Sequence, residues 1–296
     1  MKILITGANG FLGKKIKNSL NKNNIPVLTL GKSSTNDIQC DLAFEIPNLP
    51  AINMVIHAAG KAHTVPKTDN EKRNFYEVNV KGTQNILSAL GNLTQLKKFV
   101  FISSVAVYGL SEGKEIDEHA PLNAADPYGA SKIEAERLIT EWCKPRGIDY
   151  YILRLPLIVG DNPPGNLGSM IKAIQRGYYF SIGSAKVKKS MVLANDVAKL
   201  IPDLNNKSGI YNLTDGYHPT FDELERAISN SYNKGTSFKI PLTFAHILAK
   251  IGDKIGNKSP INTDRLKKIQ SELTFSDKKA RLELGWNPEP VLNFYK

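Results

Sequence analysis

The chain has 296 residues, of which 41% are apolar and 23% are charged, and its formal net charge is +11. This length and apolar content allow a full buried core in one large domain or two coupled ones, and they exclude an intrinsically disordered protein. No apolar run approaches the roughly 20 residues that cross a bilayer, and the N-terminal run is too short for a signal peptide. We therefore expect a cytoplasmic protein without stable membrane insertion.

The positive charge limits the class of binding partner, and the cysteines indicate the redox compartment. The lysines are spread along the chain instead of forming one basic stripe, so the sequence does not indicate a nucleic-acid-binding protein, whereas a pyrophosphate-bearing substrate fits the charge. Cys40 and Cys143 are far apart, which favours a reducing compartment. The histidines show no metal-ligand spacing, so no metal site is predicted.

Short β-branched runs alternate with helical patterns in the first half of the chain, as in parallel βαβ units. Strands are expected at residues 2–6, 26–30, 54–57, 98–103 and 150–154, with a possible short strand ending at Cys40, and helices at 11–21, 71–93 and 127–144. The pattern predicts an α/β fold with a doubly wound parallel sheet over residues 1–155.

Beyond Arg154, prolines and glycines interrupt this alternation, and we expect a smaller α/β cap formed mainly by residues 156–296. A strand at 190–193 and a helix at 196–204 are expected to return to the sheet, so residues 187–210 belong with the first domain. Helices are expected at 167–176, 221–231, 242–255 and 276–284. The helix at 242–255 has an apolar face flanked by lysines; we expect this face to pack within the cap, with contact to a membrane surface as the alternative.

Glycines follow the first strand at a spacing of three residues. Gly7 permits a tight turn, Gly10 lets the backbone approach a pyrophosphate, and Gly13 allows helix and strand to pack closely. A strand, a glycine turn and a helix in this order predict a dinucleotide-binding Rossmann fold. The residues expected to contact the cofactor here are Gly7, Asn9, Gly10, Phe11, Leu12 and Gly13.

The end of the second strand indicates which dinucleotide is bound. NAD-binding members of this fold carry an acidic residue there, but this chain has Lys32 and Ser33, and the first acid, Asp37, follows too late. Lys32 and Ser33 can meet a 2′-phosphate, so the sequence favours NADP over NAD.

Tyr128 and Lys132 lie four residues apart on one predicted helix, so their side chains face the same way. Ser104 follows a predicted strand at the carboxyl edge of the sheet, where α/β folds bind ligands. At these residues the chain resembles the extended short-chain dehydrogenase/reductase family, whose triad is Ser or Thr, Tyr and Lys. The resemblance implies that Tyr128 exchanges a proton with a sugar oxygen, Ser104 orients that oxygen, and Lys132 holds the nicotinamide ribose.

Tyrosine titrates near 10, so making it an effective acid or base at neutral pH requires a pKa lowered by roughly three units, or about 4 kcal/mol. We expect Lys132 to supply much of this lowering.

The resemblance implies further cofactor contacts. They lie near the adenine, under the cofactor and at an asparagine that braces the sheet, and the residues are Asp41, Leu42, His57, Ala58, Ala59, Gly60 and Asn79.

The resemblance extends along essentially the whole chain, including Leu284-Gly285-Trp286-Asn287-Pro288 near the end, and implies a UDP-sugar substrate. Its implied substrate contacts are Ser104, Asn166, Lys189 and Arg265. The relatives it suggests are 4-reductases of UDP-4-keto-6-deoxy-N-acetylhexosamines in surface-polysaccharide (O-antigen or capsule) synthesis, and UDP-N-acetylglucosamine or UDP-glucose 4-epimerases that retain NAD. The missing acid after the second strand favours an NADPH-dependent reductase.

Two further expectations accompany this reading. The family resemblance implies a homodimer through the helices at 71–93 and 127–144. An alternative of another class is a non-catalytic protein that senses NADP; the presence of both Tyr128 and Lys132 favours an enzyme.

Overall fold

A computed structural model describes residues 2–62, 64–182, 187–204, 207–235, 238–255 and 262–296. Its centre is a seven-stranded sheet in the order β11-β7-β5-β4-β1-β2-β3, in which all neighbouring pairs are parallel. The strands are β1 (Ile3–Thr6), β2 (Val27–Gly31), β3 (Ile38–Gln39), β4 (Met54–His57), β5 (Lys98–Ser104), β7 (Asp149–Leu155) and β11 (Gly209–Asn212). The order reverses between β1 and β4, so their carboxyl ends form the switch point where such sheets bind ligands.

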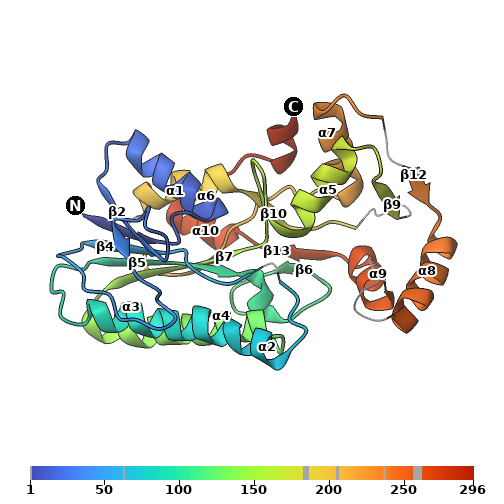
Figure 1. Ribbon diagram of the computed structural model, residues 1–296. Helices are drawn as coiled ribbons and strands as arrows, with labels where there is room; N and C mark the ends of the chain where they lie inside the picture. The colour runs from blue at the N-terminus through green and yellow to red at the C-terminus, as the bar shows by residue number, and fades with distance from the viewer. Residues whose placement is uncertain (1, 63, 183–186, 205–206, 236–237, 256–261) are drawn as a thin grey trace.

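Helices cover both faces of this sheet (Figure 1). On one face lie α1 (Phe11–Lys22) and α6 (Ala194–Leu200), which pack against each other, together with α10 (Lys278–Leu284). On the other face lie α2 (Asp69–Tyr76), α3 (Gly82–Leu90) and α4 (Pro127–Cys143). Each interface has its own apolar core, so the central strands β1, β4 and β5 are buried on both sides. The fold is therefore the predicted Rossmann-type α/β fold.

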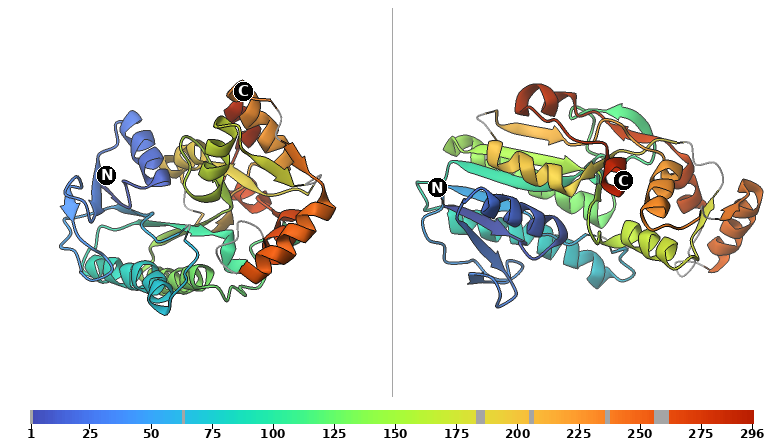
Figure 2. Two further views of the ribbon diagram at one scale, coloured as in Figure 1. Left: turned by 45° about the vertical axis from the view of Figure 1, so that its right-hand side comes forward. Right: turned by 90° about the horizontal axis from the view of Figure 1, so that it is seen from above.

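The remaining elements form a smaller unit beyond the carboxyl ends of the strands (Figure 2). Its helices are α5 (Gly165–Gln175), α7 (Phe221–Ser231), α8 (Leu242–Ile255) and α9 (Thr263–Gln270). Three parallel strand pairs link its segments: β8 (Leu157–Val159) with β10 (Met191–Leu193), β9 (Phe180–Ile182) with β12 (Phe238–Ile240), and β6 (Gly113–Ile116) with β13 (Leu273–Phe275). No helix within the described ranges is long and apolar enough to cross a bilayer.

Three expectations about the elements were wrong. The strand at 190–193 does not join the central sheet, because β10 pairs with β8; the strand that returns is β11, which sequence reasoning missed. The helix expected at 71–93 is divided by a π-helical turn at Glu77–Lys81. The apolar face of α8 is not packed within the cap, because Phe244, Ile247 and Ile251 are each at least half exposed.

Candidate active site

The glycine turn after β1 is shaped by close backbone approaches. Gly7 has a φ of +71°, and a Cβ there would lie 2.6 Å from the Ala59 nitrogen. A Cβ on Gly13 would lie 2.1 Å from the Gly7 carbonyl oxygen, so helix α1 approaches the turn too closely for any side chain. Glycine is therefore required at both positions.

The first turn of α1 offers free N–H groups at this edge. Gly10 precedes the helix without any side-chain cap, and the first turn carries no acidic residue. Uncapped N–H groups and the helix dipole attract an anion. The start of α1 is therefore suited to an anion, and contact of Asn9, Phe11 and Leu12 with a dinucleotide pyrophosphate stays a prediction.

In the described part of the chain, the two carboxylates near Lys32 and Ser33, those of Asp37 and Asp41, both have partners within the protein. One oxygen of Asp37 accepts hydrogen bonds from the Thr29 N–H at 2.9 Å and the Thr29 hydroxyl at 2.8 Å, and these bonds lower the Asp37 pKa. Asp41, the predicted adenine contact, pairs with Lys32 at 2.9 Å and also accepts a bond from the Ala43 N–H.

Three hydroxyl and amide groups gather beside this loop. Asn9 Nδ2 donates to Thr35 Oγ1 at 3.1 Å, and Ser33 Oγ lies 2.9 Å from the same oxygen. Leu42 is buried, and its carbonyl accepts a hydrogen bond from Asn85 Nδ2 at 2.8 Å. The loop therefore presents one lysine, which is paired with Asp41, and several hydroxyl or amide groups.

Buried polar groups fix the position of the segment 57–60 at the end of β4. The His57 ring lies 2.7 Å from Thr6 Oγ1 and 3.1 Å from Thr83 Oγ1. Burial, with a contribution from the nearby Lys132 charge, lowers the His57 pKa to about 3, so the imidazole is neutral at physiological pH. His57 therefore acts as a structural support under Ala58 and Ala59, whose N–H groups bond to the Thr6 carbonyl and hydroxyl.

Asn79 connects this segment to the helix that carries Tyr128. Its Oδ1 accepts from the Lys61 N–H at 2.7 Å, and its Nδ2 donates to Ser131 Oγ at 2.8 Å. Ser131 Oγ in turn donates to the Tyr128 carbonyl at 2.7 Å. Asn79 lies in the π-helical turn, and π-turns often occur at functional sites.

Ser104 and Tyr128 come together at the carboxyl edge of the sheet. Ser104 ends β5, and Tyr128 is the second residue of α4, whose start is fixed by Pro127 and by an Asp126 cap. The Ser104 side chain is near enough to the Tyr128 hydroxyl to lower its pKa, and Ser104 Oγ also accepts a hydrogen bond from the Ala106 N–H at 3.2 Å. Burial raises the Tyr128 pKa above its ordinary value, Ser104 opposes that rise, and Asp126 adds to it.

Lys132 lies one helical turn beyond Tyr128 and is buried. Its Nζ donates to the Ile102 carbonyl at 2.9 Å and lies 4.5 Å above the centre of the Phe101 ring. Burial lowers the Lys132 pKa to about 8, and Glu136 opposes that change. The net shift of the Tyr128 pKa is upward, opposite to the lowering expected from Lys132, because burial of the tyrosine is the largest effect.

Gly60 lies directly against the side chains of Lys132 and Asn79. A Cβ on Gly60 would lie 3.2 Å from Lys132 Nζ and 3.1 Å from Asn79 Oδ1. A side chain at residue 60 would crowd the lysine ammonium, so glycine preserves the position of Lys132.

Sequence reasoning missed a buried ionic network behind these residues. Arg154 pairs with Glu136 at 2.7 Å, and both side chains are almost fully buried. Ser103 Oγ donates to Glu136, while Arg154 Nη1 donates to the Tyr108 hydroxyl at 3.0 Å. Glu136 follows Lys132 by one helical turn, so this network fixes the part of α4 that carries the candidate site. Its members lie on separate elements, and no spacing in the sequence indicated their contact.

Three of the predicted substrate contacts, Asn166, Lys189 and Arg265, lie on the cap, whereas Ser104 lies at the edge of the central sheet. Asn166 is exposed near the start of α5. Lys189 Nζ donates to the Lys268 carbonyl at 2.9 Å, and burial lowers the Lys189 pKa. Arg265 belongs to α9, but its side chain is outside the described part of the chain. Within the described residues, no hydrogen bond or ion pair joins Asn166 or Lys189 to Tyr128.

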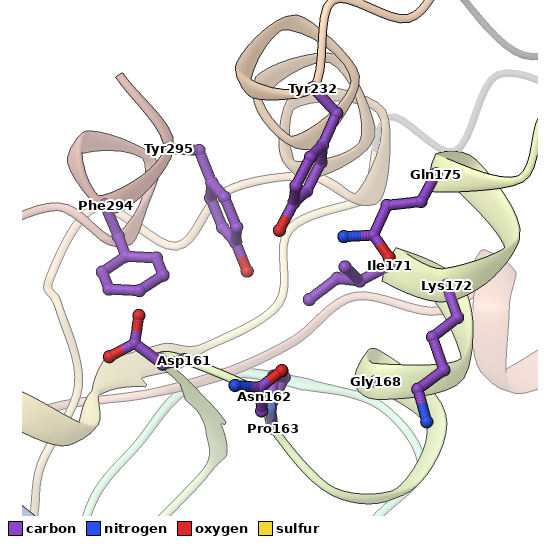
Figure 3. A pocket seen from close by; sticks show the side chains of 11 residues that line it. Asp161, Asn162, Pro163, Gly168, Ile171, Lys172, Gln175, Tyr232, Phe294 and Tyr295 are labelled. Carbon is purple, nitrogen blue, oxygen red and sulfur yellow. The ribbon is translucent and has the colours of Figure 1, made fainter.

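A cavity of about 230 Å³ lies on another side of α5 (Figure 3). It is lined by Ile171, Lys172 and Gln175 of that helix, and the hydroxyls of Tyr232 and Tyr295 point toward its interior. None of Ser104, Tyr128 and Lys132 lines it. This cavity is therefore separate from the candidate catalytic residues.

Comparisons with known proteins agree with this arrangement. Residues 3–212 match the model of the NAD dependent epimerase/dehydratase family. A UDP-glucose 4-epimerase of Vibrio cholerae is 27% identical over 98% of this chain and 92% of its own length. The N-acetyl-α-D-glucosaminyl-diphospho-ditrans,octacis-undecaprenol 4-epimerase of Escherichia coli O157:H7 is 28% identical over 94% of this chain and 88% of its own.

Among solved structures, a human epimerase family protein with NADPH covers 100% of this chain and 98% of its own, with a TM-score of 0.76 and 17% identity. At that identity, the likeness shows the fold.

Proposed function

The chain belongs to the NAD dependent epimerase/dehydratase family, and from this premise we propose that it uses NADPH to reduce the 4-keto group of a UDP-4-keto-6-deoxy-N-acetylhexosamine. The product would be a precursor of a bacterial surface polysaccharide. The observation that carries the proposal is the loop after β2, where Asp37 is occupied by Thr29, and Lys32, which pairs with Asp41 in the free chain, stands beside Ser33. That arrangement favours the 2′-phosphate of NADP, and a cofactor that exchanges with solution fits net reduction.

Each residue of the site has a separate role in the proposed reaction. A nicotinamide cofactor, when bound, supplies or accepts the hydride. The glycine turn and the first N–H groups of α1 hold the pyrophosphate, and Lys132 holds the nicotinamide ribose. Ser104 donates a hydrogen bond that orients the sugar carbonyl, and Tyr128 delivers a proton from its hydroxyl to the carbonyl oxygen as the alcohol forms.

A second candidate is a 4-epimerase of UDP-glucose or UDP-N-acetylglucosamine with tightly held NAD. The names of the V. cholerae and E. coli relatives favour it, because both are 4-epimerases. In that reaction the same tyrosine would first remove and later return a proton at the same oxygen. The two candidates share Ser104, Tyr128 and Lys132 and differ in whether the cofactor is consumed.

The test measures NADPH consumption with UDP-4-keto-6-deoxy-N-acetylglucosamine that a dehydratase generates in place. The reductase proposal expects consumption that Tyr128→Phe abolishes, and NMR of the product then gives the configuration at C4. Absence of consumption, together with interconversion of UDP-N-acetylglucosamine and its galacto isomer without added cofactor, would overturn the reductase in favour of the epimerase. Tight NADP binding without turnover of either substrate would instead support a non-catalytic sensor.

We extend the proposal to assembly and location. Helices α2, α3 and α4 form one side of the molecule, where Tyr76 is exposed and Leu138 and Trp142 are half-buried, and this surface suits a homodimer. Both cysteines are free and buried, which supports a reducing compartment such as the cytoplasm. Sedimentation velocity of the wild-type protein and of Tyr76→Glu tests the dimer, which the variant should weaken.

A further inference from the structure

Helix α8 presents its large apolar side chains to solvent and its small ones to the protein. Ala245 and Ala249 are fully buried and pack with Leu266, Ile182 and Ile240. The exposed fractions on the same helix are 62% for Phe244, 56% for Ile247, 43% for Leu248 and 50% for Ile251. This distribution is the reverse of an ordinary surface helix, whose larger apolar residues face the core.

The four exposed side chains form one continuous strip, which we call the α8 strip: Phe244, Ile247, Leu248 and Ile251. At about 100° per residue these positions span roughly 100° of the helix circumference. The buried small residues occupy the sector beside them. A contiguous exposed apolar surface of this kind marks an interaction site, whereas scattered apolar side chains do not.

Charge defines what can cover the α8 strip. Lys250 and Lys254 are exposed on the same helix, and their positions adjoin the strip on the side away from the buried sector. The acid of this helix, Asp253, is engaged by Thr263, whose N–H and hydroxyl both bond to its carboxylate. The strip is therefore flanked by lysines whose charge the helix itself does not neutralise.

We propose that α8 lies on the surface of an anionic lipid bilayer, with the α8 strip in the acyl boundary and Lys250 and Lys254 at the lipid phosphates. Apolar residues beside lysines on a helix too short to span a membrane are the features of an interfacial helix. A second copy of the chain fits less well, because pairing would bring two lysine edges together between molecules of net charge +11 each.

The location of α8 allows such contact. The helix lies at the outer edge of the cap, away from the central sheet and from the α2–α4 side (Figures 1 and 2). A dimer formed through α2, α3 and α4 would leave it uncovered. The proposal is independent of the reaction, because its test measures binding to lipid.

The experiment is cosedimentation of the full chain with vesicles of phosphatidylcholine alone and of phosphatidylcholine mixed with phosphatidylglycerol. The wild type should sediment with the mixed vesicles, and added salt should weaken the binding. Phe244→Ser/Ile247→Ser and Lys250→Glu/Lys254→Glu should each lower the partition coefficient by about tenfold or more. Circular dichroism and thermal melts verify that these surface variants remain folded.

Matched controls come from α10, another surface helix. Leu282 is 83% exposed and Lys278 is exposed, so Leu282→Ser and Lys278→Glu alter apolarity and charge elsewhere and should leave lipid binding unchanged. The proposal is overturned if the wild type ignores anionic vesicles, or if the α8 and α10 variants behave alike. Self-association in solution that only the α8 variants abolish would also overturn it and assign the strip to a second copy.

Discussion

Asp37 is turned back onto Thr29, where one carboxylate oxygen accepts both the backbone N–H and the hydroxyl of that residue. The first acid after β2 is thus committed to closing its own loop. Lys32 and Ser33 are left as the groups nearest to the place where NAD-binding relatives of this fold carry a ribose-binding acid.

Lys32→Ala should therefore raise the KM for NADPH by about 10- to 100-fold, because one charge-assisted bond to a phosphate is lost. The KM for NADH should change by less than about threefold, since NADH lacks that phosphate. Steady-state kinetics with both cofactors measures the ratio. Asp37→Asn is the control and should leave the ratio unchanged; equal KM values for the two cofactors in the wild type would contradict the assignment.

Tyr128→Phe should lower kcat by roughly 10²- to 10⁴-fold, because no group remains to exchange the proton. Ser104→Ala should lower kcat by about 10²-fold, because the hydroxyl that orients the reacting oxygen is lost. Thermal melts should show both variants folded.

Substitution of the neighbouring Ser103 distinguishes an effect on catalysis from an effect on stability. Its hydroxyl bonds to Glu136 and not to Tyr128, so Ser103→Ala should cost about 1–3 kcal/mol of stability with a small change in kcat. If Ser103→Ala reduced kcat as much as Ser104→Ala, the role assigned to Ser104 would be wrong.

Lys132 should make the protein less stable at neutral pH than an apolar residue would. Its pKa falls from an unfolded value near 10.5 to about 8 in the folded chain. Below pH 8 the ammonium is charged in both states and its burial costs about 3 kcal/mol; between pH 8 and about 10.5 the unfolded state binds more protons, so stability rises with pH.

Lys132→Met should therefore raise Tm at pH 7 while abolishing activity, a trade between stability and function. Its advantage over the wild type should shrink as pH rises from 8 to 10.5. Urea unfolding across that range gives the difference, with Lys278→Met as an exposed control that should show no such trend. A constant difference across the range would contradict a lowered Lys132 pKa.

The sequence predicted most of the sheet and the positions of Ser104, Tyr128 and Lys132, because these depend on local patterns: strand alternation, a glycine turn and an i, i+4 spacing. It could not reveal the π-turn at Asn79. One extra residue displaces the apolar pattern by a single position, which two short helices do not reveal, and the Asn79 contacts with Lys61 and Ser131 join segments distant in sequence.

Other features depend on partners distant in sequence. Periodicity identified the apolar face of α8, but the inward side is set by the packing of Ala245 and Ala249 against Leu266, which no local pattern shows. The strand β11 has only four residues and follows no alternation long enough to identify it. Substrate contacts were inferred by resemblance alone, and their geometry remains a proposal.

The Glu136–Arg154 pair should be the most sensitive structural element behind the site. Arg154→Met would leave the Glu136 carboxylate buried without its cation, and we expect a loss of about 3–5 kcal/mol in the free energy of unfolding. The double variant Glu136→Gln/Arg154→Met should lose less than the sum of the single variants, because no unpaired charge remains.

The exposed ion pairs of Arg137, on the same helix as Glu136, provide the control. Arg137 bonds to Glu134 and Glu141 on the outer side of α4, where water screens the charges, so Arg137→Ala should cost less than about 1 kcal/mol. Urea unfolding of the wild type, Arg154→Met, Glu136→Gln, the double variant and Arg137→Ala tests the comparison. If Arg154→Met cost no more than Arg137→Ala, the buried pair would not fix α4. The alignment of Tyr128 and Lys132 would then depend on the Asp126 cap, on Asn79 and on the bond from Lys132 to the Ile102 carbonyl.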